Sequence, residues 1–350
     1  LASALLANGV RIMGRSFKYH RPRGPWGAWV DDPNAIMTVR KGDVELPNCQ
    51  ATTTYLEDGM EARAVNAWPS AAFDIKGGLD LFHRWLGAGF YYKTFMWPDW
   101  HLFEPAIRKM AGLGHVSDAV LEGYSADQIH DRCDVLVIGG GPAGLVAARL
   151  ASEAGHDVCL VEDHKSIGGG ARLSDQIEGR MPDEWLMEQA RALETAGARV
   201  LTHATAFGIY DHQMVAIVEH GRFGTAPRLR RMRAGRIILA TGALDRPITF
   251  ANNDRPGIMS VTAGCTYLAQ HRVLVGRAIA LVSNNAFAGP AAAMLSAAGA
   301  EVTRIDPSAG PLSAKGGTRM LGLKQNGRTY PVETILASGG DRKSTRLNSS

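Results

Sequence analysis

The chain has 350 residues, of which 45% are hydrophobic, and its formal net charge is +4. This length and composition allow two or three domains with sizeable cores. No stretch approaches the roughly 18 uncharged apolar residues of a membrane-spanning helix, so a membrane protein is not expected. The densest basic cluster, residues 228–236, alternates with Leu229 and Met232 as in a half-exposed strand and lacks interleaved aromatics, which argues against nucleic-acid binding.

The cysteines indicate the cellular compartment. The four cysteines lie far apart and form no C-x-x-C pair; they are Cys49, Cys133, Cys159 and Cys265. Isolated cysteines are typical of reduced thiols in a cytoplasmic protein. The pattern argues against a disulfide framework, a zinc site and a dithiol redox centre, and we expect no metal site.

Residues 1–62 predict a small domain of sheet and helix. LASALLANGVRI has a helical pattern that ends at Asn8-Gly9, and residues 34–39 and 51–60 have strand composition. The helix, with Asn48-Cys49-Gln50, resembles the ferredoxin-like domain that carries a two-iron two-sulfur cluster in several amine dehydrogenases. Such a cluster takes four ligands, three of them grouped as C-x4-C-x2-C. Because residues 19–37 contain no cysteine, we expect a ferredoxin-like domain without an iron–sulfur cluster; an unrelated small α+β domain is the alternative.

Residues 63–130 form an aromatic-rich connecting region. The segment GFYYKTFMWPDW, residues 89–100, concentrates aromatic side chains that are costly to leave in water. The segment is therefore expected either in an interface with a partner protein or in a core between domains.

The stretch from Cys133 to Asp163 organises the rest of the chain. An apolar strand is followed at once by Gly139, Gly141 and Gly144 at the G-x-G-x-x-G spacing, and then by an alanine-rich helix. The first glycine permits a tight turn, the second lets a diphosphate approach the backbone, and the third brings the helix close to the strand. The next apolar strand ends in Glu162, at about the distance where a carboxylate meets ribose hydroxyls. This stretch predicts a dinucleotide site.

A later strand supports that prediction. Residues 236–247, RIILATGALDRP, form an apolar strand that runs into an A-T-G turn and resembles the second fingerprint of the two-dinucleotide-binding flavoproteins. A carboxylate at Glu162 favours NAD or FAD over NADP, whose extra phosphate it would repel. The predicted cofactor-binding residues are Gly139, Gly140, Gly141, Pro142, Ala143, Gly144, Glu162, Asp163, Lys165, Gly170, Thr241 and Gly242. The histidines, including His164, stand isolated in the sequence, and no catalytic residue is identified.

A second Rossmann-like unit is expected at about residues 252–336. It has a strand at 278–283, a helix at 290–298 and a strand at 301–305, but its turn SNNAFAG retains a single glycine, Gly289. We expect the unit to survive as architecture with its nucleotide site altered or absent. The alternative is that Asn284 and Asn285 adopt positive backbone angles and still bind a nucleotide. The fold class is thus α/β, with a Rossmann-like two-dinucleotide-binding domain over residues 131–340 that follows the ferredoxin-like domain.

Both ends of the chain are expected to be incomplete. The sequence opens on Leu1 inside a helical pattern, and residues 341–350, DRKSTRLNSS, have no apolar periodicity. We interpret these last residues as a non-native tail.

The segments SFKYHRPRG, GFYYKTFMWP and GGGPAG together resemble the alpha subunits of the heterotetrameric sarcosine oxidases. This resemblance covers residues 1 to about 340. It implies NAD in the nucleotide-binding domain, FAD and covalent FMN on a beta subunit with FMN at the alpha–beta interface, and gamma and delta subunits as further partners. It also implies oxidation of sarcosine to glycine with formation of hydrogen peroxide, and a folate-binding domain beyond this sequence.

Two functions remain open from the sequence. The chain is either the dinucleotide-binding part of an oxidoreductase subunit or a non-catalytic, nucleotide-binding assembly subunit of a related amino-acid or amine dehydrogenase. The resemblance favours NAD, whereas the flavoprotein superfamily favours FAD. A stand-alone pyridine-nucleotide disulfide reductase conflicts with the isolated cysteines.

Overall fold

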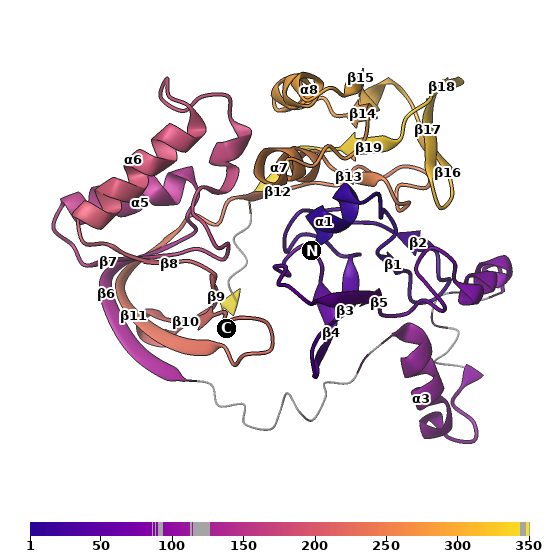
Figure 1. Ribbon diagram of the computed structural model, residues 1–350, viewed down its shortest axis with the longest axis horizontal. Helices are drawn as coiled ribbons and strands as arrows, with labels where there is room; N and C mark the ends of the chain where they lie inside the picture. The colour runs from indigo at the N-terminus through magenta and orange to yellow at the C-terminus, as the bar shows by residue number, and fades with distance from the viewer. Residues whose placement is uncertain are drawn as a thin grey trace. The chain divides into compact units, whose positions relative to one another are not determined.

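The computed structural model describes residues 1–85, 87, 89, 94–112, 114, 127–343 and 348–349 (Figure 1). The chain divides into two compact units: one combines residues 1–122 with residues 245–340, and the other combines residues 123–244 with residues 341–350. Among the described residues, no helix is both long and apolar enough to cross a bilayer.

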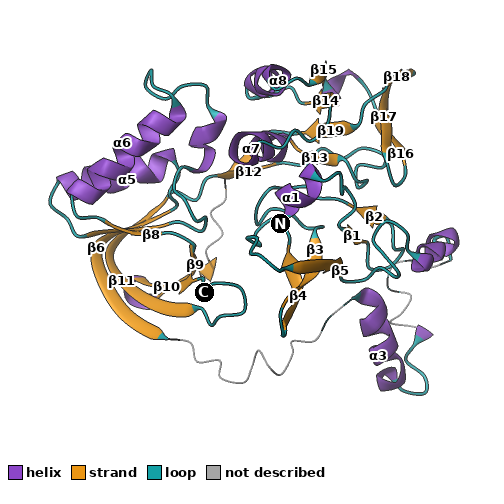
Figure 2. Ribbon diagram, in the orientation of Figure 1, coloured by secondary structure: helices purple, strands orange, loops and turns teal. Residues whose placement is uncertain are grey.

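The unit of residues 123–244 is built on a seven-stranded sheet in the order β21-β9-β10-β11-β6-β7-β8. Strands β11, β6, β7 and β8 run parallel, whereas β9, β10 and β11 form an antiparallel meander (Figure 2). The strands are β6 (Gln128–Ile138), β7 (Val158–Val161), β8 (Arg199–Leu201), β9 (Ala204–Tyr210), β10 (Met214–Glu219), β11 (Arg228–Leu239) and β21 (Asn348–Ser349).

Both faces of β7 are buried, which explains why this strand is apolar throughout. Helices α5 (Pro142–Glu153) and α6 (Pro182–Thr195) cover one face, where Leu145 and Trp185 pack against Val137 and Leu160. Side chains of the meander fill the other face. Helix α6 begins with a proline and two acidic residues, a composition that suits the positive end of a helix dipole.

The C-terminal part of the other unit contains a four-stranded parallel sheet in the order β13-β19-β14-β15. Its strands are β13 (Ile258–Ser260), β14 (Ala278–Val282), β15 (Glu301–Ile305) and β19 (Thr334–Ala337), accompanied by α7 (Val261–His271) and α8 (Ala288–Ala297). A three-stranded meander of β16 (Leu312–Gly316), β17 (Met320–Gln325) and β18 (Arg328–Tyr330) is inserted before β19. The predicted strand–helix–strand pattern of this second Rossmann-like unit is confirmed.

The N-terminal part of the same unit is a small assembly of short elements. They are α1 (Ala2–Ala7), β1 (Gly14–Arg15), β2 (Pro22–Arg23), β3 (Ile36–Lys41), β4 (Val44–Gln50), β5 (Glu61–Ala64), the 3-10 helix η1 (Ile75–Phe82) and α3 (Trp100–Ala111). Hydrogen bonds tie this part to the four-stranded sheet and its first helix: Ser260 N donates to Trp26 O at 2.8 Å, and the Tyr267 hydroxyl donates to Gly27 O at 3.0 Å.

One predicted strand is wrong. Residues 51–60 have the β-branched composition of a strand, but β5 begins only at Glu61. The backbone N–H and hydroxyl of Thr54 both donate to Gln50 O, at 3.0 and 2.8 Å, and Thr53 repeats the pattern. Threonine hydroxyls offer the backbone this local alternative to a sheet ladder, and here the turn prevails.

The aromatic-rich region leaves several large side chains exposed. Among its described residues, Trp85 is 77% exposed and Trp97 is 84% exposed, and Trp68 and Phe73 are also exposed. Residues 90–93 of the segment lie outside the described residues. Of the predicted tail, the structure describes β20 (Asp341–Lys343) and β21. The domain boundaries predicted at residues 62, 130 and 340 stay predictions.

Candidate functional site

In the glycine turn between β6 and α5, main-chain atoms pack so closely at two positions that only glycine fits. Gly139 has a φ of +109°, which favours glycine, and a Cβ atom there would lie 2.2 Å from Ala240 O. A Cβ atom at Gly144 would lie 1.8 Å from Gly139 O. Both contacts are with main-chain atoms that cannot swing away, so side chains are excluded at Gly139 and Gly144.

Gly141 differs from these two glycines because it faces open space. It is the N-cap of α5, with a φ of −75°, and a Cβ atom there would meet no heavy atom within 4 Å. Helix α5 then starts with Pro142 and has neither a side-chain cap nor an acidic residue in its first turn. The free N–H groups and the positive end of the helix dipole make such a helix start suitable for an anion.

A second glycine turn rests against the first. Gly168 N donates to Gly140 O at 2.8 Å, and a Cβ atom at Gly169 would lie 3.1 Å from the Gly141 Cα atom. Gly170 follows in the 3-10 helix η2 (Gly169–Leu173) and has open space beside it. The two turns are separated in the sequence by β7 and most of α5 but lie against each other in the fold.

Glu162 lies directly after β7 and reaches the glycine turn. Its side chain is 7% exposed. One carboxylate oxygen, Oε2, accepts the N–H of Gly140 at 2.6 Å, and the other, Oε1, accepts the backbone N–H of His164 at 2.9 Å. The predicted carboxylate is therefore brought to the predicted turn.

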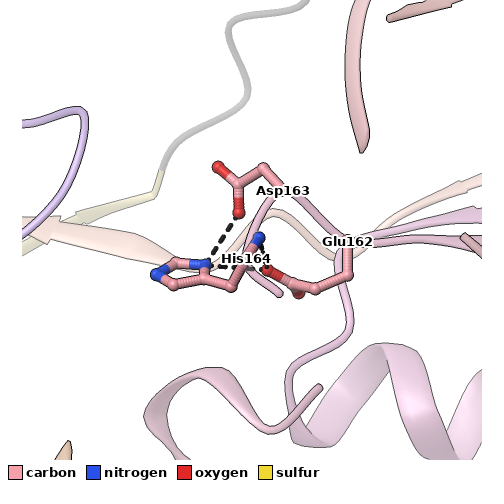
Figure 3. A group of neighbouring side chains, drawn as sticks. All are labelled: Glu162, Asp163 and His164. Atoms are coloured by element: carbon pink, nitrogen blue, oxygen red, sulfur yellow. Dashed lines mark hydrogen bonds and ion pairs between the residues drawn. The ribbon is translucent and has the colours of Figure 1, made fainter. Parts of the chain in front are cut away.

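His164 joins two carboxylates (Figure 3). Its Nδ1 atom lies 2.8 Å from Glu162 Oε1 and 2.9 Å from Asp163 Oδ1. Burial lowers the pKa of His164, but the hydrogen bonds and charges of Asp163 and Glu162 outweigh burial and raise the pKa to about 9. The imidazole is thus protonated at neutral pH. Sequence reasoning missed this arrangement, although Glu162-Asp163-His164 at the end of a strand is a signal that could have indicated it.

The same three residues have the donor types of a metal site. Their ligand atoms all lie within 4.8 Å of one another. However, an Nδ1 atom at hydrogen-bond distance from two carboxylates carries a proton, and both oxygens of Glu162 already accept backbone N–H groups. We therefore assign a hydrogen-bonded imidazolium here rather than metal ligands.

The remaining predicted residues lie on neighbouring segments. Ala240 N donates to Ile138 O at 2.8 Å, which brings the start of the A-T-G turn beside the end of β6. Thr241 and Gly242 follow, and Gly242 has a φ of +74° with open space beside it. Lys165 is close enough to His203 to lower the pKa of that imidazole, after burial, which is the larger cause.

Comparison with known proteins identifies the larger family. Residues 133–319 match the family described as pyridine nucleotide-disulphide oxidoreductase. The chain belongs to the pyridine nucleotide-disulphide oxidoreductase family. The glycine turn, Glu162 and the A-T-G turn all lie within the matched residues.

This member of the pyridine nucleotide-disulphide oxidoreductase family is also similar to curated sarcosine oxidase subunits. It is 46% identical over 320 residues to the sarcosine oxidase subunit alpha of Rhizobium meliloti (strain 1021), a match that covers 87% of this chain and 32% of that protein. It is 32% identical over 323 residues to the subunit alpha of Corynebacterium sp. (strain U-96), where it covers 28% of the protein. The predicted resemblance is confirmed, and the chain spans about a third of the length of these relatives.

A solved structure shares the fold. The crystal structure of L-proline dehydrogenase from P. horikoshii matches 98% of this chain and 57% of its own chain, with a TM-score of 0.69 and 21% sequence identity. At this identity the match establishes the mixed α/β fold and not the activity.

The expectation about iron and sulfur is wrong. Residues 1–67 match the family described as a 2Fe-2S iron-sulfur cluster binding domain, which contradicts the prediction of no iron–sulfur cluster. That prediction rests on ligand count alone, because Cys49 is the single cysteine of these residues. A match to a domain family depends on many positions of the sequence, whereas the four cluster ligands are only a few of them. One thiol does not supply the four ligands of a cluster, so we derive no chemistry from a cluster here.

The thiols do not form a dithiol centre of the kind that the family name implies. All four cysteines are free, and Cys133, Cys159 and Cys265 are buried. Burial raises the pKa of Cys133 to about 11 and the pKa values of Cys159 and Cys265 to about 12. Thiols with such pKa values remain protonated at neutral pH and react slowly.

Proposed function

We propose that this chain supplies the dinucleotide-binding part of the alpha subunit of a sarcosine oxidase-type oxidoreductase. The similarity to curated alpha subunits supports this proposal. The complete enzyme would oxidise sarcosine to glycine with formation of hydrogen peroxide. Because the chain spans about a third of those relatives, the full activity, the beta, gamma and delta partners and the folate-binding domain belong to the larger assembly.

The diphosphate of the dinucleotide would lie at the start of α5, against the backbone of Gly139–Gly144 and Gly170. A ribose would lie at Glu162, the adenine side near Asp163 and Lys165, and the remainder of the cofactor near Thr241 and Gly242. The observation that carries this proposal is the open direction at Gly141, next to a buried carboxylate that accepts the N–H of Gly140. A bound NAD or FAD would supply hydride chemistry, whereas the chain's own residues bind and orient it.

We infer NAD as the dinucleotide, with FAD as the alternative. The carboxylate of Glu162 disfavours NADP because it would repel a 2′-phosphate. The resemblance to the sarcosine oxidases favours NAD, and the flavoprotein superfamily favours FAD. Each has an adenosine diphosphate half that suits the same turn.

The second Rossmann-like unit would serve as architecture. In its turn, the Asn285 side chain accepts the N–H of Phe287 at 3.1 Å and donates to Ser338 Oγ at 2.9 Å. An amide side chain thus fills the region that glycine leaves open in the first turn. Residues 1–62 would form a ferredoxin-like α+β domain within the unit that also contains residues 245–340. The isolated thiols favour a cytoplasmic location.

A second candidate is a non-catalytic nucleotide-binding assembly subunit of a related amino-acid or amine dehydrogenase. The buried, protonated thiols favour it, because they leave no dithiol to exchange electrons with a cofactor. Reduction of the bound NAD or FAD by an amine substrate, followed as a change in the absorbance of the dinucleotide, would support the oxidoreductase part. Binding of the dinucleotide without its reduction would support the assembly role.

The test is binding by the purified chain. Nucleotide released by acid denaturation is identified by chromatography, and NAD and FAD are then titrated into stripped chain by calorimetry. We expect binding of one of them and its loss in Gly141→Val. The matched control is Gly289→Val, at a second helix start where a Cβ atom also meets open space, and it should bind normally. Normal binding by Gly141→Val would contradict the proposed position of the diphosphate.

A further inference from the structure

The hydrogen bonds of Glu162 determine how it can meet a ribose. Oε1 accepts two donors, the backbone N–H of His164 at 2.9 Å and the ring Nδ1 of His164 at 2.8 Å. Oε2 accepts one donor among the described residues, the N–H of Gly140 at 2.6 Å. A carboxylate oxygen has about two favourable acceptor directions, so Oε1 is satisfied and Oε2 keeps one direction for a further donor.

The charges around Glu162 pose a second constraint. Glu162 and Asp163 are adjacent carboxylates, and the dinucleotide adds a diphosphate to the same site. Like charges at such short range oppose each other's ionised forms and oppose binding of an anion. The ring of His164 contacts both carboxylates through the same atom and changes the charge of the three side chains from −2 to −1 when it is protonated.

We propose that His164 is a positioning residue of the dinucleotide site. Its ring fixes the Glu162 carboxylate against Gly140, so that Oε2 accepts a ribose hydroxyl. Its positive charge offsets the negative charge of Asp163. This inference rests on the proposed dinucleotide binding and assigns it a dependence on pH. A protonated His164 supports binding, and its deprotonation returns the summed charge of Glu162, Asp163 and His164 from −1 to −2 beside the cofactor.

Other ionisable groups near His164 must be considered in any measurement of pH dependence. Glu162, Asp163 and Lys165 belong to its own segment. From the loops beside the neighbouring strands, His203 N donates to His164 O at 2.7 Å, and His220 N donates to His203 O at 2.9 Å. Burial lowers the pKa values of both His203 and His220, so these two imidazoles are neutral at pH 7 and do not change charge between pH 8 and 10.

The experiment measures the dissociation constant of NAD, or of FAD if that is the ligand found, from pH 6.5 to 10 at constant ionic strength. The wild-type chain should bind about tenfold more weakly at pH 10 than at pH 7, with a midpoint near pH 9. In His164→Ala, the ring and its charge are lost, and the affinity at pH 7 should fall about tenfold. The loss should not be larger, because the backbone N–H of residue 164 still donates to Oε1.

Two further variants separate charge from packing. His164→Asn keeps a donor near the Nδ1 position but cannot be protonated, so it should recover most of the affinity at pH 7 and show no midpoint near pH 9. Asp163→Asn removes one of the two carboxylates that raise the pKa of His164, so the midpoint should move to lower pH. His156→Asn, at an exposed position after α5, is the control and should match the wild type.

Each outcome has a distinct meaning. If the wild-type chain binds neither NAD nor FAD at any pH, the proposed function fails. If it binds but shares its pH profile with His164→Asn, this inference alone is overturned. Binding that requires added Zn²⁺ and is abolished by EDTA would also overturn it, because Nδ1 would then carry a metal ion in place of a proton.

Discussion

The structure predicts opposite effects for two glycines of one turn. Replacing Gly144 with alanine places a Cβ atom 1.8 Å from Gly139 O, well inside contact distance and against main-chain atoms. Overpacking of this kind costs about 3 kcal/mol or more of unfolding free energy. Replacing Gly141 with alanine introduces a Cβ atom that meets nothing within 4 Å, at a φ of −75° that alanine adopts easily. Its cost should be about 1 kcal/mol or less.

The assay combines stability and binding. Urea unfolding is followed by circular dichroism, hydrogen exchange of the α5 amides reports on the unit of residues 123–244, and NAD is titrated by calorimetry. Gly144→Ala should be destabilised and should lose binding as a consequence, whereas Gly141→Ala should keep wild-type stability and still bind at least tenfold more weakly. Equal stability of the two variants would refute the packing role of Gly144, and wild-type affinity of Gly141→Ala would refute the binding role of Gly141.

Three further predictions concern His164, the buried cysteines and the core of the seven-stranded sheet. The pKa of His164 rises from 6.5 in the unfolded chain to about 9 in the folded chain, so protonated His164 stabilises the folded chain by up to roughly 3 kcal/mol. This contribution to the unfolding free energy is complete below pH 6.5 and is lost as pH rises to 9. Urea unfolding of His164→Asn should lack this decline. Cys133, Cys159 and Cys265 should react with a thiol reagent at pH 8 only after unfolding, and rapid reaction of the native chain would contradict their burial. Leu160→Ala removes a fully buried side chain between β7 and the helices and should cost about 3 kcal/mol, in contrast to the exposed Leu150→Ala.

The sequence predicted the central strand, turn and helix because their signals are local. An apolar run, a glycine spacing and an alanine-rich helix each depend on neighbours along the chain, and β6, the turn and α5 follow them. Glu162 was predictable because the end of a strand fixes its place. The motif predicted different roles for Gly141 and Gly144. The distance between a Cβ atom at Gly144 and Gly139 O, however, depends on where the Gly139 carbonyl points.

The rest required three-dimensional contacts. His164 is isolated in the sequence, and its role depends on a backbone turn after β7 that brings Nδ1 between two carboxylates. The division into units was not predictable, because Trp26 and Gly27 bind residues more than two hundred positions away. Residues 51–60 misled the strand prediction because a local threonine turn competes with the sheet. The iron–sulfur prediction failed because a count of cysteines does not test the ancestry of a domain.

The helix starts of the two Rossmann-like units differ in what satisfies their N–H groups. At α7, Ser260 Oγ accepts the N–H of Ala263 at 3.0 Å, and Asp245 accepts the N–H of Thr262 at 2.8 Å. At α8, Asn285 accepts the N–H of Phe287. Ser260 therefore caps α7, whereas α8 has no side-chain cap, because Phe287 is its N-cap residue and precedes the first turn.

Helix α5 also has no side-chain cap. The N–H groups of a helix start must be satisfied by a side chain, by water or by a ligand. Helix α5 differs from α8 in having glycine as its N-cap residue and a buried carboxylate bonded to its turn, and these features suit an anionic cofactor. This difference supports the proposed position of a dinucleotide in the unit of residues 123–244.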